Sequence, residues 1–471
     1  MITHSIIAQR LLAFTALSIL TAAGCVNPMH DLRHVGSLRH HVNVEMLART
    51  DNSLAPRCGG HTIPDFVVWE DGLSEEEATA VGIWNHPAYQ ALLADLSIAR
   101  ADVIEAAQIR NPSVVTMLPA GPKQWELALN VPLDVIWLRP TRVAAAQLES
   151  RRVAERLVQD GLNVMRDVRV AHIDWQIAAR RAEIGQEILT LRTEVGRIAE
   201  ARLKAGESAE LEVSAVRLDA AVGQAELQRF VRDAELARER MRYLLGMQSN
   251  DLALWPEPAN PISLGPIDVD ELVAEAIVSR PDLRAIRLAT RAAQQRASLA
   301  RRDIWGLTGM LPDLNSRGSR GFEAGPGFTF NVPIFHQNQG AITRACAQAE
   351  QLQRQYNDQQ GLVSLEVRQA FLQWKQAQQE WQLWRDHVVP QATEAVNSTQ
   401  ETLQEDAISL LLVLETTRQW LNARQGELDA EAQLCRAIAE LERSVGRRLA
   451  NYTGGGMIEQ DQYFDAIPHE T

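Results

Sequence analysis

Two stretches of matching sequence, about 200 residues apart, each join a short alternating segment to a long polar one. The first reads WELALNVPL at residues 125–133, and the second reads GFTFNVPIF at residues 327–335. Each carries Asn-Val-Pro, from Asn130 to Pro132 and from Asn331 to Pro333. The alternation predicts strands, and proline suits a strand end because it lacks the amide donor that a sheet requires. A strand that leads into a long helix, twice in one chain, predicts a duplicated and mainly helical fold.

Each junction closes a predicted β-hairpin, at about residues 112–136 and about residues 304–335. In the first, residues 112–118 precede a Pro-Ala-Gly-Pro turn and a returning strand at 125–136. In the second, residues 304–311 precede a loop at 312–326, rich in Gly, Ser, Asp and Asn, and a strand at 327–335. One apolar face fits a barrel wall between lipid and water, and equally a half-buried strand of a soluble protein. Residues 112–118 are shorter than the roughly 9–11 residues that a membrane strand needs.

Long helices follow both hairpins, at residues 142–203 and 341–403. Both are rich in Ala, Leu, Glu, Gln and Arg, and Pro390 is their only proline. At about 1.5 Å per residue, each unbroken helix reaches roughly 90 Å. The pattern Val-Arg-x-Ala-x-x-x-Trp occurs in both, ending at Trp175 and at Trp374. Because apolar residues at helical spacing usually pack in a core, we interpret both tryptophans as core residues, with a binding site as the alternative.

Both long helices are interrupted, at KAGESA (204–209) and at QEDAIS (404–409), and returning helices follow at 210–245 and 410–449. Gly206 and Asp406 are residues that cap or turn a helix. Shorter helices precede each hairpin, with matching acidic starts and a proline turn. The chain therefore divides into a first repeat at 73–258 and a second at 259–450, and the Gly-rich tail at 451–471 is expected to be disordered.

The N-terminus is expected to be an export signal. Residues 1–24 have a short start with one cation, an apolar core and small residues before Cys25, which is typical of a secretory signal peptide. Ala-Gly before Cys25 resembles a bacterial lipobox, although Ala22 replaces the usual Leu. Lipidated Cys25 would then begin a leader at 25–72. Its histidines and Cys58 suit either a weak metal-binding tract or a solvated segment without ligand spacing.

Composition excludes several classes of function. The chain has 471 residues, 23% charged residues and a net charge of −13, which argues against a nucleic-acid partner. The cysteines form no C-x-x-C pair, so we expect no zinc or redox site and no cofactor. Beyond the N-terminus no apolar run is long enough for a membrane helix. The sequence has no P-loop, H-E-x-x-H or nucleophile-elbow motif, so we expect that this chain is not an enzyme.

The order of these motifs resembles the TolC family of outer-membrane efflux channels over about residues 73–449. The matching segments are Asn111-Pro112, both Asn-Val-Pro junctions, SRPDL at 279–283, KAGES at 204–208 and AISLL at 407–411. NVPIFHQNQG at 331–340 is most similar to the heavy-metal efflux subgroup of CzcC- and CusC-like proteins. Lipobox cysteines are common in this family.

The resemblance implies a homotrimer in which each chain gives four strands to a twelve-stranded barrel and its helices to a periplasmic tunnel. Asn130, Pro132, Asn331 and Pro333 would mark the change from barrel to tunnel. The channel would passively conduct substrates from an inner-membrane pump, such as one of the RND type, through a periplasmic adaptor. It would sit in outer-membrane lipid, anchored through Cys25 and extending into the periplasm.

The resemblance places the breaks near Gly206 and Asp406 at the periplasmic mouth, where an adaptor or pump docks. Glu207, Glu210, Glu405 and Asp406 would put carboxylates there, and carboxylate rings favour cations in a pore. The alternative is that these are solvated charges at helix ends.

Two questions stay open from the sequence. The chain could instead be a lipid-anchored coiled-coil spacer of the envelope without a pore, although a spacer has no use for two hairpins with one apolar face. The exported substrate, metal cations or drugs, is not readable.

Overall fold

The computed structural model describes residue 67 and residues 72–118, 126–247, 255–257, 264–265, 267–304, 307–316, 322–330, 332–404 and 410–449. The expected signal peptide, Cys25, nearly all of the leader and the tail lie outside these ranges, so those expectations stay predictions. The described part is mainly helical with one four-stranded sheet, which confirms the predicted fold class.

The chain divides into two compact units. Unit 1 comprises residues 1–37, 91–159 and 281–360, and unit 2 comprises residues 38–90, 160–280 and 361–471. Each unit therefore draws segments from both halves of the sequence. The long helices α6 (Val135–Ala205) and α10 (Gln339–Leu383) each contribute residues to both units.

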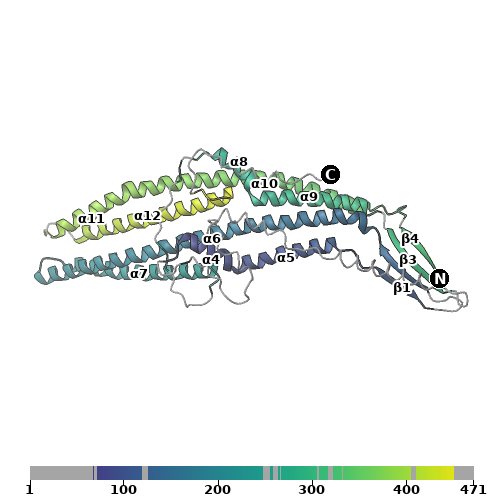
Figure 1. Cartoon of the computed structure of the whole chain (residues 1–471). Helices are drawn as coiled ribbons and strands as arrows, with labels where there is room; N and C mark the ends of the chain where they lie inside the picture. Colours follow the sequence, from purple (N-terminus) through teal and green to yellow (C-terminus); the bar gives the residue numbers. More distant parts are fainter. Residues whose placement is uncertain are drawn as a thin grey trace. The chain divides into compact units, whose positions relative to one another are not determined.

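A single antiparallel sheet forms one part of unit 1 (Figure 1). Its strands follow the order β1 (Ser113–Met117), β2 (Glu126–Pro132), β3 (Leu307–Ser316) and β4 (Phe322–Phe330). The β2–β3 ladder joins the two predicted hairpins into one sheet. The register shifts between Leu127 and Leu129 and between Met310 and Asp313.

Three strand boundaries differ from the sequence prediction. β2 ends at Pro132 and α6 begins at Val135, inside residues 125–136 that were expected to be strand. The Leu138 amide already donates to the Asp134 carbonyl (3.0 Å), and Pro140 lies within the helix rather than before it. β3 and β4 also occupy much of the predicted loop at 312–326, because a register shift accommodates its glycines and prolines in the ladder.

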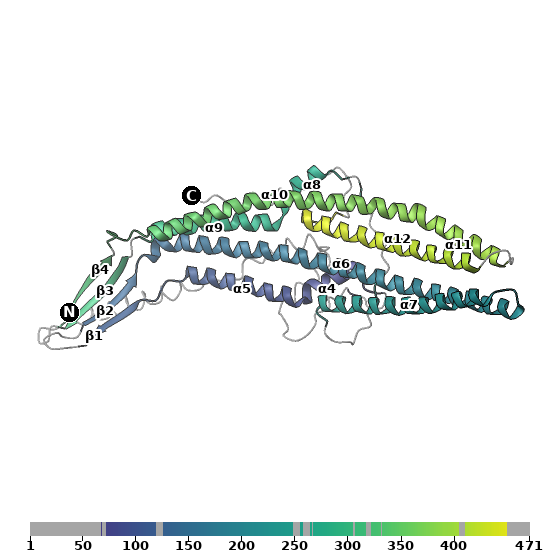
Figure 2. The ribbon, with the colours of Figure 1, turned by 180° about the vertical axis from the view of Figure 1, so that it is seen from behind.

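Four helical segments of unit 1 lie side by side in the order α5 (Pro87–Ala107), α6, α9 (Pro281–Arg302) and α10 (Figure 2). Polar contacts join each neighbouring pair. Arg142 Nε donates to the Ala106 carbonyl (2.9 Å), Arg284 pairs with Glu155 (3.0 Å), and Gln359 donates to Asp282 (3.2 Å). The helices of both sequence halves are thus aligned beside each other in this unit.

Unit 2 contains two helical hairpins and two short helices. The hairpins are α6 with α7 (Glu210–Leu244), and α10 and α11 (Val389–Gln404) with α12 (Leu410–Val445). The short helices are α4 (Glu75–Asn85), which starts at a Ser74–Glu77 capping box, and α8 (Val269–Ser279). The helix breaks match the predicted breaks at 204–209 and 404–409.

The second long helix contains a π-helical segment, Trp384–Val388, directly before Val389 and Pro390. The Val389 amide bonds to the Trp384 carbonyl, five residues earlier. Proline has no amide and clashes with the carbonyl four residues before it, so a local change to wider hydrogen bonding relieves the conflict. In the described residues α6 has no such interruption over its 71 residues.

The repeated Val-Arg-x-Ala-x-x-x-Trp pattern packs as core in both halves. Val168, Ala171 and Trp175 are buried with Val81 and Met241, and the set Val367, Ala370 and Trp374 is also buried. The interpretation of both tryptophans as core residues is therefore confirmed.

Candidate functional site: a sheet with free edges and two helical tips

The sheet has an open edge on each side. Among the described residues, β1 pairs with β2 alone and β4 pairs with β3 alone. An unpaired strand edge presents amide and carbonyl groups that must find partners, and in lipid each unsatisfied group costs several kcal/mol. A single copy of this sheet is therefore incomplete in a membrane.

The first strand is exposed on both faces. All five residues of β1 are solvent-exposed, including Val114 at 61% and Met117 at 53%, and Leu118 beyond it is 75% exposed. A free edge with uncovered apolar side chains is a surface for lipid or for another chain.

Strand length differs between the two hairpins. β3 and β4 have 10 and 9 residues, which suits the roughly 9–11 residues of a tilted membrane strand. β1 and β2 have 5 and 7 residues, so the first hairpin is short, as the sequence indicated.

The two Asn-Val-Pro junctions differ in how soon a helix follows the strand. Asn130 lies within β2, opposite Ser113 on one side and Met310 on the other, and Pro132 ends the strand opposite Thr308. Helix α6 follows almost at once. In the second junction Asn331 lies outside the described residues, Pro333 follows the end of β4, and α10 begins only at Gln339. The role of these residues as a boundary between barrel and tunnel stays a prediction.

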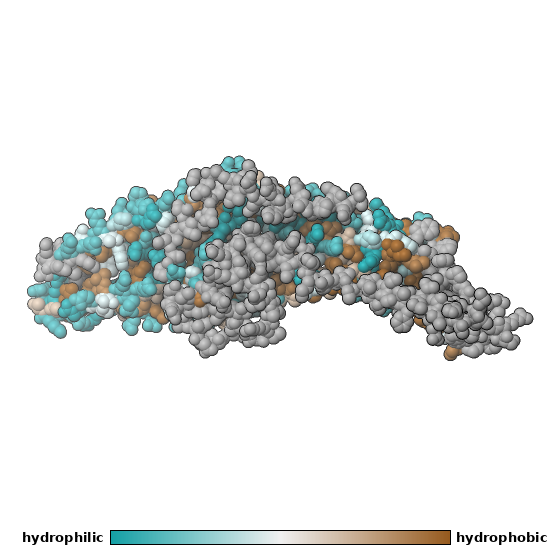
Figure 3. All heavy atoms as spheres, viewed as in Figure 1, coloured by the Kyte–Doolittle hydropathy of each residue, from teal (hydrophilic) through white to brown (hydrophobic). Residues whose placement is uncertain are grey.

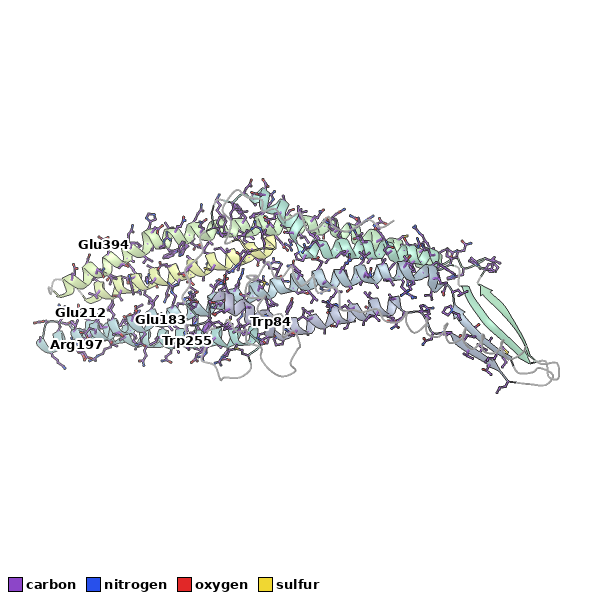
Figure 4. The ribbon with its side chains drawn as sticks, in the orientation of Figure 1. Trp84, Glu183, Arg197, Glu212, Trp255 and Glu394 are labelled. Carbon is purple, nitrogen blue, oxygen red and sulfur yellow. The ribbon has the colours of Figure 1, made fainter. Side chains whose placement is uncertain are left out.

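The first helical tip is built on Gly206. Its φ of 78° is the left-handed conformation that glycine favours at a helix C-terminus. The Gly206 amide donates to the Leu203 carbonyl (3.0 Å) and the Glu207 amide to the Arg202 carbonyl (2.9 Å). Glu207 and Glu210 are exposed. Ser208 Oγ donates to Glu212 (2.7 Å), which Figure 4 shows beside this turn together with Arg197.

The second tip lies between the end of α11 at Gln404 and the start of α12 at Leu410. Glu405 and Asp406, the carboxylates expected there, lie outside the described residues. Glu401, one turn before, is exposed. Of the four carboxylates expected at the tips, the structure therefore describes only Glu207 and Glu210, and the carboxylate ring stays a prediction.

Sequence reasoning missed a buried ionic cluster in unit 2. Arg169 is 7% exposed and contacts Glu442, which is 6% exposed, as well as Glu75 (3.1 Å). Glu442 also accepts the Leu449 amide (2.8 Å). Nearby, His172 Nε2 lies 2.7 Å from the Leu73 carbonyl, and burial lowers the pKa of this imidazole. The repeated motif flagged Arg169, but its carboxylate partner is distant in sequence.

An open groove of about 580 Å³ runs between α6, α10 and α12 in unit 2. Its polar lining mixes both charges: Arg166, Arg436, Asp167, Glu380, Glu440 and Gln376. Within the described ranges, no three His, Cys, Asp or Glu side chains are grouped to hold a metal ion. No helix found in those ranges combines the length and hydrophobicity needed to cross a membrane.

Comparison with known proteins gives consistent matches. The family model described as "Outer membrane efflux protein" matches residues 272–447. The cobalt-zinc-cadmium resistance protein CzcC of Cupriavidus metallidurans is 22% identical over 383 residues, covering 80% of this chain and 90% of that protein.

Two solved structures show the same fold. CusC, whose structures describe transmembrane channel formation, has a TM-score of 0.67 at 15% identity and covers 80% of this chain and 93% of its own. The CmeC outer membrane channel of Campylobacter jejuni has a TM-score of 0.66 at 15% identity, with coverage of 79% and 85%.

These matches agree with the duplicated hairpins, the four-stranded sheet and the helix breaks found in the chain. The matched family consists of efflux channel proteins and is not an enzyme family. Residues 272–447 therefore match the outer-membrane efflux protein family, and the fold of the described residues is similar to that of outer-membrane channels such as CmeC.

Proposed function

We propose that this chain is one protomer of a homotrimeric outer-membrane channel that passively conducts substrates out of the cell and catalyses no reaction. One observation supports the proposal most directly: in the described residues, an antiparallel four-stranded sheet has two unpaired edges, and all five residues of its outer strand β1 are exposed. Three such sheets, edge to edge, would close a twelve-stranded barrel and satisfy every edge.

Two partners belong to this proposal. A periplasmic adaptor and an inner-membrane pump, such as one of the RND type, would deliver substrate to the helical tips. Exposed Glu207 and Glu210 support a docking or gating role at the first tip, and Glu405 and Asp406 would supply it at the second. The protein would be held in the outer membrane by its barrel and by a lipid on Cys25, and its helices would extend into the periplasm.

Metal cations are the substrate class that we propose. The CzcC relative is named for cobalt, zinc and cadmium resistance. The acidic tip residues support this choice, because carboxylates near a pore mouth raise the local concentration of cations.

A planar-bilayer recording of the purified full chain tests the channel. We expect stepwise conductance, and a trimer after chemical cross-linking in mild detergent. A sample that is folded by circular dichroism yet monomeric and electrically silent would instead favour the spacer. Replacing Val115 with Pro removes an amide from the free-edge strand and should abolish the trimer, whereas Ile98→Ser on α5 should leave it intact.

Deletion of the gene tests the substrate. We expect the deletion strain to become more sensitive to cobalt, zinc or cadmium. A copy of the intact gene should restore tolerance, whereas a Val115→Pro copy should not. Unchanged tolerance of all three metals, with increased sensitivity to drugs, would move the substrate to organic compounds.

A further inference from the structure

Hydrogen bonds link four helix ends of unit 1 on the side that leads to the sheet. Arg139 Nε, in the first turns of α6, donates to the Ala107 carbonyl at the end of α5 (2.7 Å). Arg302, at the end of α9, donates to Thr141 of α6 (2.9 Å). Asn338, just before α10, donates to the Ala300 carbonyl of α9 (2.9 Å). These bonds fix the ends of α5 and α9 and the starts of α6 and α10 together (Figures 1 and 2).

Apolar side chains project from this level without cover. They are Ile109 (52% exposed), Ile136 (73%), Val332 (60%), Ile334 (67%) and Phe335 (94%). None of them belongs to a strand of the sheet. Figure 3 shows hydrophobic side chains gathered where the helices meet the sheet.

The turn that carries Phe335 is held by hydrogen bonds. The Ile334 amide donates to the Val332 carbonyl (2.9 Å), and the Gln337 amide to the side chain of Gln339 (3.1 Å). Asn338 has a φ of 58°, a left-handed conformation that asparagine tolerates, and its side chain is tied to α9. A fixed turn that presents an aromatic ring to solvent costs hydrophobic free energy unless something covers the ring.

Basic residues accompany these side chains. Arg110, Arg301, Arg302 and Arg344 are all exposed at the same helix ends. The acidic residues beside them are Asp134 and Asp303; burial and the nearby Asp134 raise the pKa of Asp303, and Arg110 opposes this shift. A local excess of arginine contrasts with the chain's net charge of −13. Guanidinium groups bind phosphate with paired hydrogen bonds.

We propose that these nine residues form a collar that binds the anionic phospholipid headgroups of the membrane leaflet next to the helices. The apolar side chains enter the boundary of the acyl region, and the arginines bind lipid phosphates. The collar would set how deep the barrel sits in the membrane. A further copy from outside the proposed trimer is a poorer occupant, because each copy presents the same positive charge at this level. The inference rests on the proposed function, since it assumes that the sheet is in a bilayer.

The depth of the collar can be measured with brominated lipids. The full chain carrying Phe335→Trp is reconstituted in vesicles of phosphatidylethanolamine and phosphatidylglycerol, and its added fluorescence is compared with the wild-type background. We expect quenching by lipids brominated near the headgroup. Ile98→Trp is the matched control: Ile98 is 61% exposed in the middle of α5, so iodide in solution should quench it and bromolipids should not.

The arginines are tested by lipid retention. Native mass spectrometry of the detergent-solubilised protein compares bound phosphatidylglycerol with phosphatidylcholine. Arg110→Gln with Arg344→Gln should reduce the preference for phosphatidylglycerol by about tenfold or more. Arg291→Gln with Arg354→Gln, exposed positions nearer the middle of α9 and α10, should leave it unchanged.

Conductance and cross-linking on the same samples separate this inference from the proposed function. A trimer that conducts, with no bromolipid quenching at position 335, would overturn the collar alone. Shielding of that tryptophan from both bromolipid and iodide would assign the surface to protein contact and would equally overturn it. Absence of conductance with intact headgroup quenching would overturn the channel while the lipid site stands.

Discussion

Unit 2 contains the same Val-Arg-x-Ala-x-x-x-Trp pattern twice, and the residues of the two copies differ in their surroundings. Arg169 of the first copy is buried against Glu442 and Glu75. Arg368, at the matching position of the second copy, pairs with Asp270 (2.6 Å) while both side chains are more than half exposed. Matching arginines therefore have different surroundings: Arg169 belongs to a buried ionic network, and Arg368 forms a solvent-exposed ion pair.

A ring beside each core tryptophan differs as well. His172 lies 6.2 Å from Trp175 between ring centroids, and Phe371 lies 5.5 Å from Trp374. His172 and Phe371 follow Ala171 and Ala370 directly, so they occupy matching positions. The first copy has a titratable ring where the second has an inert one.

The two helical hairpins differ in which helix supplies a glycine and which supplies an aromatic ring at their contact. In the first, Gly185 of α6 lies against Phe230 of α7, and in the second Trp384 lies against Gly426 of α12. Trp384 is the residue that matches Gly185, since it follows at the same separation as Trp374 follows Trp175. In the first hairpin the outgoing helix supplies the glycine and the returning helix the ring, and in the second hairpin this is the other way round. Both hairpins therefore place an aromatic ring against a glycine, but the ring is on opposite helices.

The largest expected effect is on the buried arginine. Arg169→Ala leaves the Glu442 carboxylate buried without its main partner, which should lower the free energy of unfolding by about 3–5 kcal/mol. Arg368→Ala removes an exposed pair and should cost about 0–1 kcal/mol. Denaturant unfolding in detergent, followed by circular dichroism, measures both variants. Equal losses would show that the two copies are alike despite their different burial.

The glycine contacts come next. A methyl at Gly426 would lie 2.6 Å from the Trp384 ring, so Gly426→Ala should cost about 1–3 kcal/mol through overpacking. Gly361→Ala on α10 is the matched control: a Cβ there meets nothing within 4 Å, so it should gain about 1 kcal/mol of helix propensity. Adding Trp384→Leu to Gly426→Ala should recover part of the loss. Stabilisation by Gly426→Ala alone would disprove the tight contact.

His172 should make the first copy sensitive to pH. Burial lowers its pKa in the folded chain, so the unfolded chain, with a value of about 6.5, takes up the proton first as the pH falls. Its stabilising contribution is complete above about pH 6.5 and declines below it, by at most about 1.4 kcal/mol per pH unit, until the folded site also protonates.

His172→Phe copies the second half and should flatten this decline, whereas Phe371→Leu should leave the slope unchanged. Unfolding titrations between pH 7 and pH 5 measure the difference. Burial lowers the pKa of His86 too, so a smaller slope should remain. An unaltered slope in His172→Phe would assign the effect to other groups.

The smallest effect concerns the tips, of which only the first has a glycine at its turn. Gly206→Ala should cost about 1 kcal/mol, because the left-handed φ strains an alanine although its Cβ has free space. Hydrogen exchange at the Glu207 amide should become faster. Gly340→Ala, in α10 and also unhindered, should be neutral or stabilising.

Features that depend on neighbouring residues could be predicted from the sequence. The core tryptophans, the helix breaks and the presence of two hairpins all followed from periodicity and from turn residues. The extent of β3 and β4 did not, because Gly, Pro and Asp at 312–326 signal a loop locally while the ladder to the neighbouring strand overrides that signal. The Arg169–Glu442 pair could not be read either, since nothing in the sequence shows which distant carboxylate meets a given arginine.

The free edges of the sheet have a genetic consequence. In the proposed trimer each copy gives one edge to each of two neighbours, so a copy with a damaged β1 leaves an intact neighbour with an unsatisfied strand. If intact and damaged copies are made equally and mix at random, about one assembly in eight contains only intact copies. A strand-breaking allele such as Val115→Pro should therefore be dominant over the normal gene, whereas loss of the whole chain should be recessive.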